Sequence, residues 1–133
     1  MSRSGYSDDL DEPTLNLWRG AVASAIRGKR GQALLREMAA ALDAMLVKEL
    51  IASELENEGE YCALGVVGKA RGIDMADIDP EDYEAVAETF GVATALTQEI
   101  MWQNDEAWSH REAPEHRWSR MRQWVLENIK EGK

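Results

Sequence analysis

Apolar residues recur at spacings of three and four along most of this chain, and that spacing limits it mainly to helical folds. The clearest case is one continuous apolar face in residues 34–45, formed by Leu34, Leu35, Met38, Ala41, Leu42 and Met45. The same segment is rich in Ala, Leu and Glu, which favour helix. We therefore predict a mainly α fold, a compact bundle of about six helices.

Similar stripes and helix-end signals predict the other helices. Their expected spans are about 13–27, 62–72, 79–90, 92–103 and 114–131. The first should break at residues 28–31, where glycines and cations suit a helix end. Asp79 is expected to cap the helix that follows it, with Pro80 in the first turn. Gly65 and Gly68 would weaken a helix, so another backbone should pack closely there.

Residues 49–62 have a different character. Asn57 and Gly59 favour a short β-hairpin near the tip of this segment, whereas a continuous helix as far as Leu55 remains an alternative. The polar residues 1–12 should form a flexible acidic tail. Residues 13–131 should form a single helical domain.

The charge is strongly negative and unevenly distributed. The chain of 133 residues has 15 Lys and Arg against 25 Asp and Glu, a net charge of −10. Residues 49–106 contain two basic and fifteen acidic residues, whereas residues 14–48 and 107–133 are net basic. An acidic chain is poorly suited to sequence-independent binding of nucleic acid or anionic lipid, which depends on basic groups. Cationic surfaces are its natural partners.

One run of acidic residues is a candidate partner-binding face. It contains Asp74, Asp77, Asp79, Glu81, Asp82 and Glu84. A solvated surface is the simpler interpretation. The functional interpretation is a surface for Lys and Arg of a partner, or a mimic of nucleic-acid phosphates, with strongly salt-dependent binding.

A second candidate surface combines tryptophan and arginine. Trp124 lies beside the apolar stripe of the last predicted helix and close to Arg117 and Arg120. Trp and Arg dominate interface hot spots, so these three residues could form a partner surface. The alternative is that Trp124 covers the edge of the core, with the arginine stems lying on it.

The net basic segments, residues 14–48 and 107–133, suggest a different function. Nucleic-acid binding would use the cations of the first two helices, provided that they converge on one face; they are Arg19, Arg27, Lys29, Arg30 and Arg36.

Catalytic and metal-binding motifs are weak. His110 and His116 are six residues apart, which does not suit two zinc ligands on one helical face. Cys62, the only cysteine, lies in an apolar setting where a thiol usually packs as a small hydrophobe. Neither glycine-rich segment has the spacing of a phosphate-binding loop. We expect no metal, no cofactor and no enzymatic activity; an enzyme using Cys62, His110 or Asp105 would need those groups together in a cleft.

The compartment follows from what the sequence lacks. A single cysteine excludes an intramolecular disulfide and fits a reducing environment. The N-terminal residues have no apolar segment of the kind found in signal peptides, and no apolar run is long enough to span a membrane. We therefore expect a cytoplasmic protein; a homodimer is left open.

Three short segments resemble a group of small, largely uncharacterised bacteriophage and prophage proteins. They are Trp-Arg-Gly-Ala-Val-Ala-Ser-Ala-Ile-Arg-Gly-Lys-Arg-Gly at residues 18–31, Cys-Ala-Leu-Gly at 62–65 and Asn-Asp-Glu at 104–106. The resemblance implies a phage source and a bacterial host cell, but no chemistry. Together with the acidic centre, it suggests a non-enzymatic inhibitor, similar to anti-CRISPR proteins, that binds a basic surface of a host nucleic-acid-handling or defence complex. Nucleic-acid binding through the basic helices is the alternative.

Overall fold

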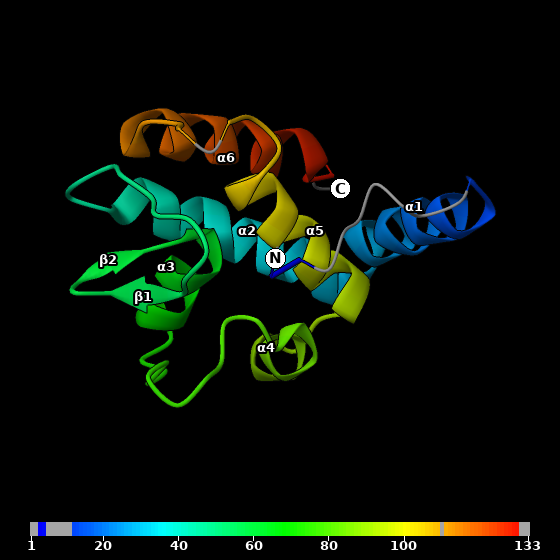
Figure 1. The fold of residues 1–133 in the computed structure, drawn as a ribbon, viewed down its shortest axis with the longest axis horizontal. Helices are drawn as coiled ribbons and strands as arrows, with labels where there is room; N and C mark the ends of the chain where they lie inside the picture. Colours follow the sequence, from blue (N-terminus) through cyan, green and yellow to red (C-terminus); the bar gives the residue numbers. More distant parts are fainter. Residues whose placement is uncertain (1–2, 5–11, 110, 131–133) are drawn as a thin grey trace.

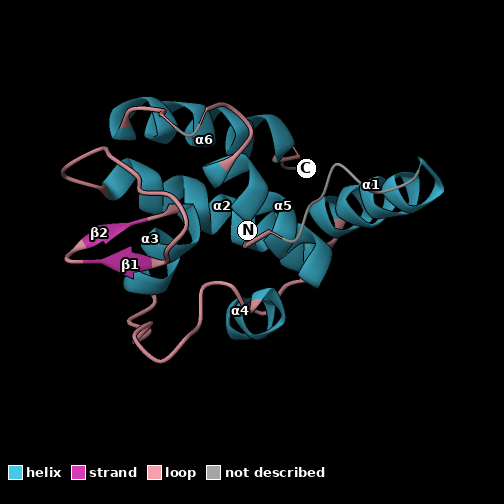
Figure 2. Cartoon of the chain, in the orientation of Figure 1, coloured by secondary structure: helices cyan, strands magenta, loops and turns pink. Residues whose placement is uncertain are grey.

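Six α-helices and one two-stranded hairpin form the regular structure of the described residues in the computed structural model (Figures 1 and 2). The structure describes residues 3–4, 12–109 and 111–130. The elements are α1 (Glu12–Arg27), α2 (Lys29–Ala44), β1 (Glu56–Asn57), β2 (Glu60–Tyr61), α3 (Ala63–Ala70), α4 (Tyr83–Phe90), α5 (Thr94–Asp105) and α6 (Pro114–Asn128). The predicted mainly α fold is confirmed. Among the described helices, none has the length and apolar character needed to cross a membrane.

Helix α2 lies at the centre of the core. Figure 1 shows it between α6 and α3, and it packs against both. The apolar face predicted from the sequence is the buried one, because Leu35, Met38 and Leu42 are completely inaccessible to solvent. Helices α1 and α4 both pack against α5, and the outer part of α1 extends beyond the other helices (Figure 1).

The hairpin forms within residues 49–62, as one of the two predicted alternatives. β1 pairs antiparallel with β2, with Glu56 opposite Tyr61. The turn between them consists of Glu58 and Gly59, whose φ angles of 52° and 83° suit the two-residue turns that match strand twist. The alternative of a helix reaching Leu55 is wrong, because residues 45–55 contain no helix.

Helix α4 begins later than predicted. Asp82, not Asp79, is its N-cap, and its carboxylate accepts a hydrogen bond from the Ala85 N–H at 3.2 Å. Asp79 instead accepts from the Glu81 N–H, only two residues ahead, which closes a local turn. Both aspartates have capping chemistry, and the turn at Asp79 delays the helix by three residues.

Gly65 confirms the predicted close packing on α3. A Cβ atom added there would lie 1.9 Å from the carbonyl oxygen of Leu55, so only glycine allows this approach of the two backbones. At Gly68 the neighbour is the Met75 side chain, at 2.5 Å, and not a backbone. Close packing at Gly65 holds the base of β1 against the start of α3.

The N-terminal residues differ in part from the predicted tail. Arg3 and Ser4 are buried against the domain, and the Ser4 carbonyl accepts a hydrogen bond from Gln98 at 2.9 Å. Arg3 is held because its guanidinium pairs with a buried carboxylate of α5. The rest of the predicted tail, up to residue 11, and residue 131 at the end of the predicted domain lie outside the described residues.

Candidate functional site

A groove of about 470 Å³ lies between the hairpin and the loop that joins α3 to α4. Residues 54–59 form one wall; Met75, Ala76, Ile78 and Pro80 form the other. The hairpin wall includes all of β1 but no residue of β2, so the groove follows the outer edge of β1. In Figure 1 the α3–α4 loop runs below the hairpin, on the side of β1.

The groove has an apolar floor and a charged rim. Leu55 and Met75 are buried at its base, and Ile78 is half-buried beside them. Glu54 and Glu56, on either side of Leu55 in the chain, are exposed. This alternation follows from extended backbone, in which successive side chains point to opposite faces.

The acidic residues predicted from the sequence all reach solvent. Asp74, Asp77, Asp79, Glu81, Asp82 and Glu84 are exposed in or directly after the α3–α4 loop. Asp74 accepts a hydrogen bond from the Ala76 N–H at 3.0 Å, in the same way as Asp79 and Asp82 accept from nearby amides. These contacts shape the loop and leave other carboxylate oxygens free to accept bonds.

Sequence reasoning missed the other half of the acidic surface. Glu54, Glu56 and Glu58 are also exposed, in the hairpin segment that forms the opposite wall. The placement of Glu54 and Glu56 on either side of Leu55 was the available signal, because two residues is the period of a strand. We call these three glutamates and the six predicted carboxylates the acidic face.

Two cations, Lys69 and Arg71, lie between the two parts of the acidic face in the sequence. Arg71 donates two hydrogen bonds to Glu37, at 2.7 and 2.6 Å. The hydrogen bond from Arg71 lowers the pKa of the Glu37 carboxyl, although its partial burial acts in the opposite sense. Lys69 places its Nζ 5.1 Å from the centre of the Tyr61 ring. Neither cation forms an ion pair with a described carboxylate of the acidic face.

The predicted surface of Arg117, Arg120 and Trp124 is wrong for Arg117. This residue is only 5% exposed, and its guanidinium donates to the carbonyls of Asn104 and Leu50, both at 3.0 Å. Trp124 is half-buried and packs against the core, which is the alternative that the sequence allowed. The arginine lies inward because α6 turns that side toward the end of α5.

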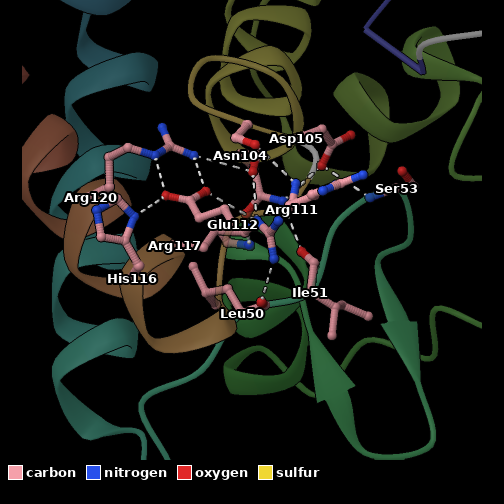
Figure 3. A network of polar contacts seen from close by, with 12 residues as sticks. Leu50, Ile51, Ser53, Asn104, Asp105, Arg111, Glu112, His116, Arg117 and Arg120 are labelled. Carbon is pink, nitrogen blue, oxygen red and sulfur yellow. Dashed lines mark hydrogen bonds and ion pairs between the residues drawn. The ribbon is translucent and has the colours of Figure 1, made fainter.

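Glu112 is the centre of a buried polar network (Figure 3). Its side chain is 1% exposed and pairs with Arg120 at 2.8 Å, with Arg117 at 3.5 Å and with the Nδ1 of His116. Burial alone would raise the pKa of Glu112. The hydrogen bonds from Arg120 and His116, with the positive charges nearby, outweigh burial and hold that pKa below its ordinary value.

Asn104 connects this network to the base of the hairpin. Its side-chain oxygen accepts from the Ala63 N–H at 3.1 Å, and its amide donates to the Ile51 carbonyl at 2.9 Å. The Leu50 carbonyl is bound by Arg117 from the same side. The network therefore positions the segment that leads into β1, the hairpin wall of the groove.

Asp105 and Cys62, two of the three residues that an enzyme would need together, each make structural contacts. Asp105 accepts from Arg3 at 2.6 and 2.9 Å and from the Ser53 N–H at 3.0 Å. Burial would lower the pKa of Arg3, but nearby Cys62 and Asp105 raise it above its usual value. Cys62 is 1% exposed and caps α3, accepting from the Gly65 N–H through its Sγ. His110 lies outside the described residues.

The predicted basic residues are exposed but only partly gathered. Arg36 donates to the Lys130 carbonyl at 2.7 Å, and Lys130 donates to the Arg27 carbonyl at 2.9 Å, so these three meet at the end of α6. Arg30 donates to the Gly91 carbonyl at 3.4 Å, and Lys29 is exposed beside it. Arg19 lies about two turns earlier on α1.

Within residues 3–4, 12–109 and 111–130, no group of three or more His, Cys, Asp or Glu side chains is arranged to hold a metal ion. Comparison of the chain with family models, with curated protein sequences and with solved structures finds no match.

Proposed function

We propose that this protein is a non-enzymatic binding protein whose acidic face covers a basic surface of a partner protein. The observation that carries the proposal is the groove itself: its hairpin wall bears three exposed glutamates, and its other wall belongs to the loop that carries the predicted acidic run. Neither nearby cation, Lys69 or Arg71, forms an ion pair with these carboxylates. Exposed charges of one sign raise the rate of encounter with an oppositely charged partner. They also disfavour partners of the same sign, which for this protein are acidic proteins.

The class of partner follows from the charge and from the resemblance noted above. A basic protein surface that handles nucleic acid already binds phosphates, and a cluster of carboxylates can occupy the same site. The similarity to phage and prophage proteins suggests that this surface belongs to a bacterial nucleic-acid-handling or defence complex. The protein would then act in the host cytoplasm as an inhibitor of the anti-CRISPR type.

A labelled deca-arginine peptide provides a defined probe for the acidic face. Asp74→Asn, Asp77→Asn and Asp79→Asn together remove three charges, while the amide oxygens keep the turn contacts. We expect this variant to bind the peptide about tenfold more weakly, the sum of three exposed charge pairs. Fluorescence anisotropy at about 50 and 300 mM NaCl measures the affinity, which should fall as salt rises.

The matched control removes three exposed charges that belong neither to the acidic face nor to the groove lining: Glu106→Gln, Glu115→Gln and Glu127→Gln. It should bind the peptide within about twofold of the unmodified protein. Equal loss in both variants would mean that only the total charge matters, and the proposal would fail. Binding of duplex DNA that is lost in Lys29→Gln/Arg30→Gln would instead support the nucleic-acid alternative.

A further inference from the structure

The hydrogen-bond register of the hairpin leaves β1 with backbone groups that point outward. The Cys62 N–H donates to the Leu55 carbonyl at 3.2 Å, so these two residues occupy a hydrogen-bonding position of the ladder. Such pairs alternate with non-bonded pairs in an antiparallel ladder. The next pair, Glu56 and Tyr61, is therefore non-bonded. Both residues turn their N–H and C=O groups away from the partner strand.

The two edges of the hairpin differ in what covers them. On the β2 edge, the outward carbonyl of Tyr61 accepts a hydrogen bond from the Ile51 N–H at 3.0 Å. On the β1 edge, no described residue forms a hydrogen bond with the N–H or C=O of Glu56. Because the groove is lined by residues 54–59, this free edge borders it. A bare strand edge beside a groove is the template used when an extended peptide adds to a sheet.

The surroundings of the edge specify the side chains of an added strand. Successive side chains of such a strand would point to opposite faces. One face would meet the exposed carboxylates of Glu54 and Glu56, and the other would lie over the apolar floor at Met75 and Ile78. Charge complementarity then requires Arg or Lys on the first face, and burial favours an apolar residue on the second.

We propose that the groove binds an extended segment of the partner protein in which Arg or Lys alternates with apolar residues, and that this segment pairs with Glu56 as an added strand. The inference rests on the proposed function and makes it more specific, since it assigns backbone pairing as well as charge. The bound segment would exchange hydrogen bonds with both outward groups of Glu56, its N–H and its C=O.

The test of strand addition compares three peptides on the unmodified full chain, and the Asp74/Asp77/Asp79→Asn variant serves only to test the proposed function alongside it. The parent peptide is acetyl-(Arg-Val)₄-amide; the other two are N-methylated at every second residue, one at the valines and one at the arginines. In an added strand, only one of these two sets of N–H groups can face β1. The peptide methylated on that set should bind about tenfold more weakly, because one or two hydrogen bonds are lost. The peptide methylated on the other set should bind like the parent. Amide exchange at Glu56 should also slow when the parent binds.

Each result separates this inference from the proposed function. Equal binding of all three peptides, with the usual loss in the Asp74/Asp77/Asp79→Asn variant, would overturn strand addition but leave the acidic face as a binding surface. Failure of all three peptides and of deca-arginine would overturn both. Unchanged exchange of the Glu56 amide in the saturated complex would also contradict strand addition.

Discussion

Replacing Glu112 with alanine is expected to lower the free energy of unfolding by about 3–5 kcal/mol, the cost of removing one partner from a buried ion pair. The Glu112 side chain is buried, and Arg117, its neighbour at 3.5 Å, is buried as well. Without the carboxylate, the guanidinium of Arg117 would keep only the carbonyls of Leu50 and Asn104. A buried positive charge without a counterion is strongly unfavourable.

Urea denaturation followed by circular dichroism measures this loss. Glu115→Ala is the matched control, because Glu115 is an exposed acid on the first turn of the same helix. It should change the free energy of unfolding by less than about 1 kcal/mol. A similar, small cost for both substitutions would show that the Glu112 network does not hold α6 to α5.

The stability that the Glu112 carboxylate contributes should depend on pH, and the direction of its pKa change determines how. The pKa of Glu112 is lowered in the folded protein, from an ordinary value of 4.5. The contribution of Glu112 to the free energy of unfolding is therefore complete above the pKa that it has in the unfolded chain. It is lost as the pH falls through the pKa that it has in the folded protein. The difference in stability between the unmodified protein and Glu112→Gln should shrink on acidification below about pH 4.

Asp105→Ala is expected to have a comparable effect, about 3–5 kcal/mol of unfolding free energy, by a different route. The substitution removes the acceptor of two Arg3 hydrogen bonds and of the Ser53 N–H. Arg3 is 4% exposed, so its charge would be left buried without its carboxylate partner. The substitution should loosen residues 3–4 and the segment that leads into the hairpin, because Asp105 binds both.

A double-mutant cycle with Arg3→Met isolates this pair. The double variant should lose clearly less than the sum of the two single variants, with a coupling of about 1–3 kcal/mol. Asp43→Ala is the matched control, since Asp43 pairs with Arg122 at an exposed site and its loss should hardly change the stability. Additive effects of Arg3→Met and Asp105→Ala would show that the buried contact is not formed in solution.

The helices could be predicted from the sequence because their evidence is local. The apolar period of residues 34–45 identified the buried face of α2, and Gly65 correctly indicated a close backbone approach. The start of α4 was misplaced because Asp79 and Asp82 have the same capping chemistry, and only the turn geometry decides between them. Local patterns thus predict that a segment is helical more reliably than they predict the residue at which the helix begins.

The candidate site could be predicted only in half, because the groove joins segments that are distant in the chain. The carboxylates of residues 74–84 form a visible run, but no local pattern places Glu54, Glu56 and Glu58 across the groove from the loop that carries this run. Arg117 was assigned to the surface because helical spacing puts it beside Trp124. Its burial depends on Leu50 and Asn104, residues 67 and 13 positions away.

Chemical-shift mapping by NMR tests the central claim most directly. On titration of the full chain with acetyl-(Arg-Val)₄-amide, the largest amide shifts should fall in residues 54–59 and 74–84, and they should fade as NaCl is raised. The junction of α1 and α2 should remain unchanged. Shifts centred on that junction or spread evenly over the surface, or no saturable shifts at low salt, would contradict binding through the acidic face.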